Sequence, residues 1–373
     1  MVGHMRITRA AALNLSGHVV LVRISTDAGI EGIGEASPMY PPIICAVVNQ
    51  VLAPLLEGEN PFEIERLYDR MLYSRPGRYC NYKLGPQGAL TSAISGVEIA
   101  LWDIVGKALG EPVYALLGGL YRERVQVFAS MALARERTPD AWAVRARHFV
   151  EQGFGGVKVA VGQEWGCDSG EDDPVATVRA VRETVGDGVD ILVDAHNAYY
   201  PHTAAAIAQK FEPYRVFHFE EPVAAYDWEG LAWVRDHTTT PIAAGEQVYT
   251  LPEFRRFLAA GAVDVLQFDV TKAGGLWAGK KIATLAEAWG VPLTLHNYHS
   301  PVATAAMLHF ASATPACRYR QEVRAAPHPL LDIVHNPPQP EAGTMAPPAS
   351  PGLGLELNEE RIATYISGGG IDS

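Results

Sequence analysis

The sequence predicts an α/β fold in which a modified, TIM-like (β/α)8 barrel carries an α+β capping domain. Two observations support this prediction. After residue 119, eight short apolar runs alternate with amphipathic stretches of helical character. From the third run onward, a polar or ionisable residue follows each run at intervals of 23 to 27 residues. An open doubly wound sheet is the weaker alternative, because it usually has fewer strands and a glycine fingerprint near its start.

Residues 1–118 lack this alternation and predict a compact α+β unit. Residues 6–36 are expected to form two strands joined by a turn. Apolar residues recur with a period of about 3.6 between 42 and 73, which indicates helix, whereas 74–87 is rich in Gly, Pro, Arg and Tyr and predicts a loop. A further helix surrounds Glu98, which we expect to pair with a nearby cation.

The eight apolar runs are predicted as barrel strands, and the amphipathic stretches as helices. The runs are 125–129, 156–161, 191–193, 216–219, 242–244, 263–268, 292–295 and 318–321. The clearest helical stretches are 140–151, 203–211, 251–259 and 276–289. We therefore place the barrel at 119–330, and we expect the C-terminal segment 331–373 to return to the capping domain formed by 1–118.

Composition and charge exclude several classes of partner. The 373 residues carry a formal net charge of −12, which disfavours nucleic acid, because phosphate binding needs clustered Lys and Arg. We find no apolar run that would span a bilayer and no apolar core of a signal peptide, so no membrane partner is expected. The four cysteines are far apart and form no CxxC pair, so we expect a protein of the reducing cytoplasm.

Three carboxylates follow successive predicted strands: Asp194, Glu220 and Glu246. The carboxyl ends of barrel strands meet at one mouth, so these side chains should converge there. Converging carboxylates repel one another and need a cation, and oxygen-only ligation suits Mg²⁺. Glu221 should point away from this set, because side chains alternate along a strand.

The next two strand ends place Asp269 and His296 side by side at the mouth. A carboxylate bonded to an imidazole fixes its tautomer and raises its basicity, so this pair predicts a general base. His196 shares the face of Asp194 and is either a proton donor or a contact of the metal ligands.

Lys158 is assigned to the end of the second predicted strand, and Glu322 follows the eighth. Lys158 would either neutralise a substrate oxygen or pair with a carboxylate. Glu322 would hydrogen-bond a substrate carboxylate if protonated, and otherwise anchor the structure. His18 and His299 are further residues that could line a pocket.

Several segments resemble the enolase superfamily, in its mandelate racemase branch. They are ALTSAISGVEIALWDIVGKALGEPVYALLGG at 89–119, QFDVTKAGG around Asp269, LHN ending at 297, and PGLGLELNEE at 351–360. The resemblance extends over nearly the whole chain. The likeness is greatest to acid-sugar dehydratases of the galactonate dehydratase type.

The resemblance implies a capping domain built from both ends of the chain, whose loops close the barrel mouth. It also implies Mg²⁺ on the three carboxylates, and His296, polarised by Asp269, as the base that removes the proton α to a carboxylate. The DxH spacing of Asp194 and His196 is similar to that of galactonate-type dehydratases. There, the histidine delivers a proton to the leaving 3-hydroxyl, and the product is a 2-keto-3-deoxy acid.

The sequence also departs from the branch. Many relatives carry KxK at the second strand, where this chain has Lys158 followed by Val159 and Ala160. Racemisation or cycloisomerisation through a second lysine is therefore disfavoured. The segment after His296 is bulkier than the usual NPLGP, and the 13–18 loop is short. Both departures alter the pocket, so the resemblance does not assign galactonate as the substrate.

We therefore expect a Mg²⁺-dependent dehydratase of an aldonic or aldaric acid, a carbon–oxygen lyase with a small-molecule carboxylate as substrate. One alternative is a racemase, epimerase or cycloisomerase that uses the same enediolate. An alternative of another class is a non-catalytic, metal-bound binding protein. The resemblance also suggests a homo-oligomer.

Overall fold

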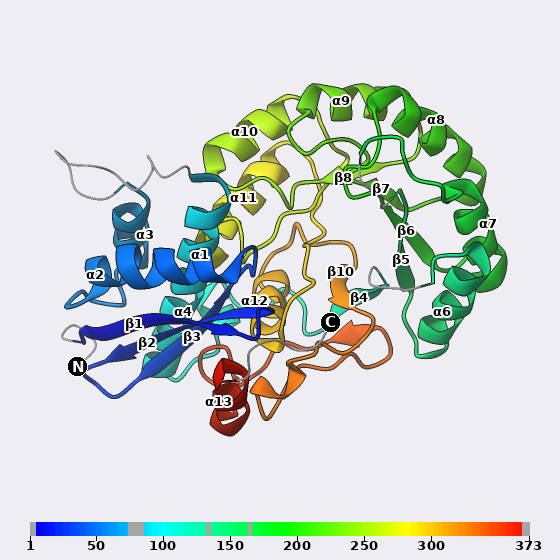
Figure 1. Ribbon diagram of the computed structural model, residues 1–373. Helices are drawn as coiled ribbons and strands as arrows, with labels where there is room; N and C mark the ends of the chain where they lie inside the picture. Colours follow the sequence, from blue (N-terminus) through cyan, green and yellow to red (C-terminus); the bar gives the residue numbers. More distant parts are fainter. Residues whose placement is uncertain (1–4, 74–85, 132–135, 163–165, 368–373) are drawn as a thin grey trace.

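The computed structural model describes residues 5–73, 86–131, 136–162 and 166–367, so residues 74–85 of the predicted loop lie outside the described residues. Figure 1 shows two parts side by side, a ring of strands and helices and a smaller unit of sheet and helices.

The smaller unit contains an antiparallel sheet in the order β1-β2-β3. Its strands are β1 (Ile7–Leu15), β2 (Val19–Thr26) and β3 (Glu31–Ala36). Helix α4 (Thr91–Leu109) packs closely on β3, because a Cβ on Gly34 would lie 2.1 Å from the carbonyl oxygen of Gly96. Glycine therefore sets the distance between this sheet and its helix.

The other helical segments of the smaller unit join the sheet to α4 and α4 to the ring. They are α1 (Pro41–Ala46), η2 (Val47–Leu52), α2 (Ala53–Leu56), α3 (Ile64–Tyr73), η4 (Pro86–Leu90) and α5 (Val113–Leu116).

The ring is built on parallel strands in the order β10-β4-β5-β6-β7-β8-β9, with the short β11 pairing antiparallel to β4. The strands are β4 (Val125–Ser130), β5 (Gly156–Ala160), β6 (Asp190–Asp194), β7 (His218–Glu220), β8 (Ile242–Ala244), β9 (Val265–Leu266), β10 (Gln321–Arg324) and β11 (Thr344–Met345). This sheet and its covering helices confirm the predicted α/β fold with a capping unit.

Three of the predicted strands are wrong in detail. Residues 292–295 form no regular strand, and only an isolated bridge joins Leu293 to Leu266. Their hydrogen bonds go partly to side chains, since the backbone N–H of Leu295 donates to Oε1 of Gln321 at 2.8 Å. The last strand is shifted from 318–321 to Gln321–Arg324, and β9 is shorter than 263–268.

Helices cover the outside of the strands, as Figure 1 shows. They are α6 (Pro139–Glu151), α7 (Pro174–Val185), α8 (Pro201–Phe211), η5 (Glu212–Tyr214), α9 (Trp228–Asp236), α10 (Leu251–Ala259), α11 (Gly275–Ala288), α12 (Pro301–Ser312), η6 (Leu331–Ile333) and α13 (Glu359–Ser367). The four clearest helical stretches of the sequence correspond to α6, α8, α10 and α11.

The C-terminal helix α13 lies against the sheet of the smaller unit. Arg23 on β2 pairs with Glu359, and the backbone N–H of Ser16 donates to the carbonyl of Tyr365. These contacts agree with a C-terminal segment that returns to the cap, although the domain limits after residues 118 and 330 stay a prediction.

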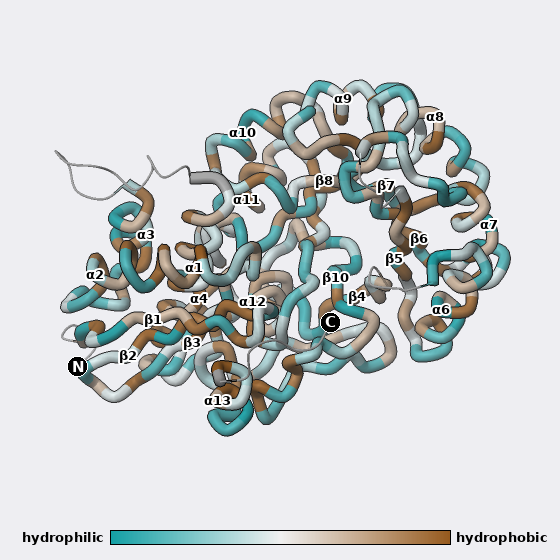
Figure 2. The backbone as a smooth tube through the Cα atoms, viewed as in Figure 1, coloured by the Kyte–Doolittle hydropathy of each residue, from teal (hydrophilic) through white to brown (hydrophobic). Residues whose placement is uncertain are grey.

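Apolar side chains fill the interior of both parts. Figure 2 shows brown along β1 to β3 and along the strands of the ring.

One stretch, Gly88–Leu109, is long and apolar enough to cross a membrane by length and composition. The expectation from the sequence that no such run exists is therefore wrong. Because 83% of its apolar window is buried inside the protein, the stretch serves as a core helix.

Two buried carboxylates of the smaller unit hold the N-termini of ring helices. Glu98 accepts hydrogen bonds from the backbone N–H groups of Leu276 and Trp277, at 2.7 and 2.8 Å, and not from the expected cation. Glu35 on β3 accepts from Ser300 and from the N–H of Ala303, at the start of α12. Each of these helices follows a segment that carries a predicted site residue, Asp269 before α11 and His296 before α12, so these carboxylates fix the mouth of the ring against the cap.

Glu98 should make stability depend on pH. Burial raises the pKa of Glu98 to about 7, so the folded protein holds a proton that the unfolded chain releases near pH 4.5. This contribution is complete below the unfolded pKa and is lost as pH rises through 7, on the order of 3 kcal/mol in total. Urea unfolding at several pH values should show wild type losing stability relative to Glu98→Gln between pH 4.5 and 7. A difference independent of pH would contradict this assignment.

Candidate active site

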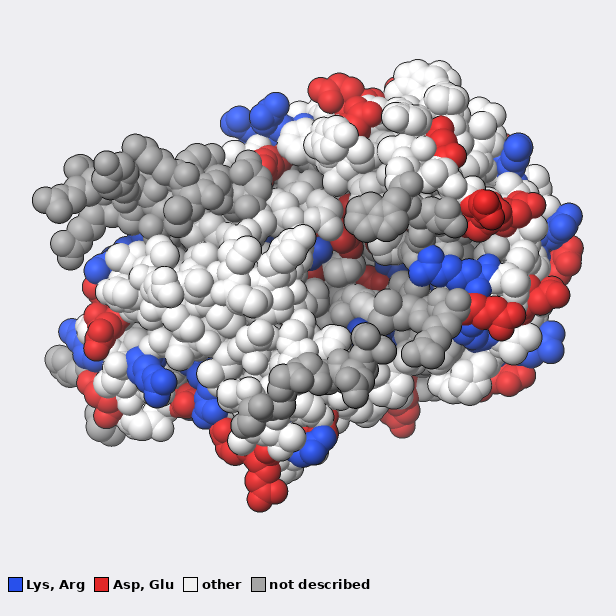
Figure 3. Space-filling view, viewed as in Figure 1, with Lys and Arg blue, Asp and Glu red and all other residues white. Residues whose placement is uncertain are grey.

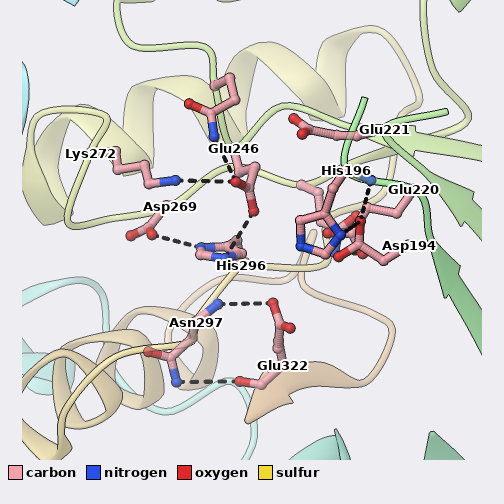
Figure 4. A network of polar contacts seen from close by, with 12 residues as sticks. Asp194, His196, Glu220, Glu221, Glu246, Asp269, Lys272, His296, Asn297 and Glu322 are labelled. Atoms are coloured by element: carbon pink, nitrogen blue, oxygen red, sulfur yellow. Dashed lines mark hydrogen bonds and ion pairs between the residues drawn. The ribbon is translucent and has the colours of Figure 1, made fainter. Parts of the chain in front are cut away.

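Most of the predicted site residues lie at or just beyond the carboxyl ends of the ring strands, and His296 follows the irregular segment 292–295. Figure 4 shows most of them close together. Their ion-pair contacts form two groups. The first joins Lys158, Asp194, His196, Glu220 and Glu322. The second joins Glu246, Asp269 and His296 with two residues that were not predicted as site residues, Lys272 and His299.

Lys158 is the centre of the first group. Its Nζ lies 3.1 Å from Oδ2 of Asp194, 3.0 Å from Oε1 of Glu220 and 2.7 Å from Oε1 of Glu322. The lysine side chain is 2% exposed, and although burial lowers its pKa, the carboxylates raise it well above the usual value. Of the two options for Lys158, these contacts match pairing with carboxylates, and they give Glu322 the place of an anchor.

His196 lies at the edge of the first group. Its backbone has a φ of 46°, in the left-handed region, and its Nδ1 is 3.0 Å from Oδ1 of Asp194. Burial lowers the pKa of His196, but the Asp194 carboxylate outweighs this effect and raises it to about 9. The imidazole remains 46% exposed and can therefore meet a ligand in the mouth.

His296 lies between two carboxylates in the second group. Its Nδ1 is 2.8 Å from Oδ2 of Asp269, and its Nε2 is 2.9 Å from Oε2 of Glu246. Burial opposes the charged imidazole, yet the pKa of His296 is raised well above its usual value by these two partners. The predicted contact between Asp269 and His296 is therefore present.

His299 is a residue that sequence reasoning placed only as a possible pocket residue. Its Nε2 lies 2.6 Å from Oδ2 of Asp269, the same oxygen that holds His296. The other oxygen, Oδ1, accepts from the N–H and the hydroxyl of Thr271. The three-residue spacing from His296 was the only signal in the sequence, because the contact depends on the turn before α12.

Lys272 and Glu221 are two further charged residues that lie beside the candidate site. Lys272 Nζ lies 3.2 Å from Oε1 of Glu246, a contact that its position three residues after Asp269 could have suggested. Glu221 has its carboxyl turned away from Glu220 in Figure 4, and its Oε2 accepts from Nδ2 of Asn197 at 3.1 Å. Burial raises the pKa of Glu221 to about 8.

The acidic residues fit a divalent cation by charge and by donor type. Three of these carboxylates, on Asp194, Glu220 and Glu246, lie beside the ammonium groups of Lys158 and Lys272. Carboxylates gathered in this way attract cations, and a dication would interact favourably with all three. The donors on the three predicted ligands are all oxygens, as hard cations prefer. Figure 4 shows Asp194 and Glu220 together, with the Glu246 carboxylate directed to His296.

A second set of possible ligands consists of Asp269, His296 and His299, whose ligand atoms lie within 4.8 Å of one another. Both rings of this set already hydrogen-bond one carboxylate oxygen, at 2.8 and 2.6 Å. The contacts therefore suit an oriented base better than a metal centre.

The mouth lies at a hollow between the two parts of the molecule. Figure 3 shows acidic and basic atoms at the base of this hollow. The arrangement offers two imidazoles, each bonded to a carboxylate, beside a cluster of oxygen ligands. Such groups can take a proton from one atom of a bound anion and give a proton to another.

Comparisons with known proteins agree with this arrangement. The family model of the mandelate racemase / muconate lactonizing enzyme N-terminal domain matches residues 7–118, and the enolase C-terminal domain-like model matches 141–361. D-xylonate dehydratase of Haloferax volcanii is 34% identical over 364 residues, covering 93% of this chain and 85% of that protein. D-galactonate dehydratase of Ralstonia pickettii is 34% identical over 373 residues, covering 96% and 94%.

A solved structure is similar over almost the same length. It is that of a mandelate racemase/muconate lactonizing protein from Paracoccus denitrificans PD1222 complexed with magnesium. The TM-score is 0.89 at 32% sequence identity, and the alignment covers 96% of each chain.

Proposed function

The chain belongs to the enolase superfamily, in its mandelate racemase branch, and from this premise we propose that it is a Mg²⁺-dependent dehydratase of an acid sugar. The substrate would be an aldonate or aldarate that loses the proton α to its carboxylate and then its 3-hydroxyl. The relatives named as dehydratases of xylonate and galactonate support this reaction class.

The observation that carries the proposal is the presence of two imidazole–carboxylate pairs at one mouth. His296 bonds Asp269 at 2.8 Å, and His196 bonds Asp194 at 3.0 Å. Elimination of water needs a base at C2 and an acid at C3, and a histidine on each of two strand ends supplies both. A single histidine would suffice for exchange of the C2 proton alone.

The three predicted ligands, Asp194, Glu220 and Glu246, would hold the metal. When bound, Mg²⁺ would offset the negative charge that develops on the substrate carboxylate as C2 loses its proton. The superfamily relative complexed with magnesium supports this choice of metal.

The remaining steps follow from the chain's own residues. Asp269 orients the His296 imidazole, which takes the C2 proton. His196 gives its proton to the departing 3-hydroxyl, so that water leaves and an enol remains. The enol then tautomerises to a 2-keto-3-deoxy acid. Glu322 anchors Lys158, which in turn holds the carboxylates of Asp194 and Glu220. Ala160 leaves no second lysine for racemisation.

We further propose that the protein is a homo-oligomer of the cytoplasm. The curated relatives are metabolic enzymes that act on small acid sugars by name, and this supports a small-molecule substrate. Light scattering coupled to size exclusion measures the oligomeric state directly.

The decisive experiment separates proton abstraction from elimination. We expect wild type, incubated with Mg²⁺ and a panel of acid sugars in D₂O, to form a 2-keto product. His196→Asn should stop keto-acid formation while deuterium still enters C2 of the recovered substrate, because His296 remains. The matched control is His202→Asn, an exposed histidine at the start of α8, which should behave as wild type.

The outcomes distinguish the alternatives. Deuterium at C2 without keto product in wild type would instead favour an epimerase. Metal binding with no exchange in any acid sugar would favour a non-catalytic binding protein. Unchanged keto-acid formation in His196→Asn would show that another group is the acid.

A further inference from the structure

Arg324 is the last residue of β10 and shares a strand face with Glu322, because side chains alternate along a strand. Glu322 reaches Lys158 inside the ring. The Arg324 side chain therefore leaves the strand on the same face, two residues closer to the mouth.

Arg324 has no ionic partner among the residues that the structure describes. Its guanidinium carbon lies 4.2 Å from the centre of the Tyr298 ring, within the range of a cation–π contact. Its Nε is buried and has no hydrogen-bond partner. The neighbouring strand offers a second such atom, because Ser130 is in register with Arg324 and its buried hydroxyl also has no partner. Buried polar atoms without partners are rare in folded proteins and call for a ligand or water.

His328 lines a small cavity together with Arg324. The cavity has a volume of about 70 Å³, and its other polar lining includes His299 and Thr304. His328 is 8% exposed, and its Nδ1 accepts a hydrogen bond from the N–H of Leu330 at 3.0 Å. In a neutral imidazole the other nitrogen then carries the proton, so Nε2–H is a donor, and no partner for it occurs in the described part of the chain.

The surroundings of His328 are positive. Burial, the largest cause, lowers its pKa to about 3 together with the electrostatic effects of Arg324, His299 and His18. The His299 ring is hydrogen-bonded to Asp269, whereas Arg324 has no ionic partner in the described ranges. His18 comes from the turn between β1 and β2, so the cap contributes to this region. A cationic, partly buried guanidinium beside a neutral donor suits a carboxylate, which accepts hydrogen bonds on two oxygens.

We propose that Arg324 and His328 form a subsite for a second, terminal carboxylate of the substrate, so that this chain prefers a six-carbon aldarate over the corresponding aldonate. The inference rests on the proposed dehydratase function and narrows its substrate class. It also separates this chain from the relatives whose names specify aldonates.

The test compares a hexarate with the hexonate of the same configuration. Wild type should show a kcat/KM for the hexarate about 10- to 100-fold above that for the hexonate, as expected for charge-assisted hydrogen bonds. Arg324→Gln should bring this ratio close to one. Arg320→Gln is the matched control, because Arg320 lies just before β10 and bonds Asp190 and Gln126 instead, and it should keep the wild-type ratio.

Binding measured by calorimetry in the His296→Asn background separates the two proposals. If no acid sugar is dehydrated, the proposed function fails, but the ratio of hexarate to hexonate Kd still decides the subsite. Tighter hexarate binding that disappears with Arg324→Gln supports the subsite. Three results would overturn the subsite: equal binding of both acids, an equal loss of the hexarate preference in Arg320→Gln, or a preference for a 6-phosphohexonate over the hexarate.

Discussion

Replacing His296 with asparagine should lower kcat by a factor on the order of 10²–10⁴ and abolish deuterium incorporation at C2. Asparagine has a similar shape and can still donate to Oδ2 of Asp269, but its amide cannot take a proton near neutral pH. The rates of dehydration and of exchange at C2 should decrease together, because elimination depends on prior loss of the C2 proton. The measurements are keto-acid formation and exchange in D₂O with Mg²⁺ present.

His237→Asn is a suitable control for this variant. His237 stacks on Trp233 at the end of α9, with 4.0 Å between ring centres, and takes no part in the two contact groups of the mouth. Both variants should retain the circular dichroism spectrum of wild type. Normal exchange at C2 in His296→Asn would mean that another residue is the base, and His299 would be the first to examine.

The parts of the fold that could be predicted from sequence are those whose signal is local. Strands β4 to β8 each contain an apolar run followed by a turn, so their pattern was sufficient. Residues 292–295 have the same apolar pattern, but Gln321 supplies the acceptor for Leu295 with its side chain. An apolar run cannot indicate which of its backbone groups will bond to a side chain, so this irregular segment was predicted as a strand.

In the candidate site, too, only the residues that follow a regular sequence pattern could be predicted. The regular interval between strand ends was enough to place Asp194, Glu220 and Glu246 at one mouth. The contact of His299 with Asp269 could not be predicted, because it depends on a turn between a strand end and α12. Glu98 was expected to meet a cation, and it meets the N-terminus of α11 instead, 178 residues away in sequence. Such non-local contacts have no periodic signal.

Removal of the metal should abolish turnover, and Mg²⁺ should restore it. Asp194 and Glu220 pair with Lys158, which explains how the fold tolerates them, and Mg²⁺ would bind these carboxylates only in the folded state, where they converge. Saturating Mg²⁺ should therefore raise the free energy of unfolding, by about 2.7 kcal/mol at 100 times its Kd. Thermal unfolding and calorimetric titration, after dialysis against EDTA, measure both effects.

Glu220→Gln should weaken Mg²⁺ binding and lower kcat together, because it removes one anionic ligand and one partner of Lys158. Its neighbour Glu221 provides the matched control. Glu221→Gln keeps an acceptor for Asn197 and removes no proposed ligand, so Mg²⁺ binding and turnover should survive. If Glu221→Gln loses Mg²⁺ while Glu220→Gln keeps it, the assignment of the second ligand is wrong. Strand alternation, on which that assignment depends, would then not hold beyond the end of β7.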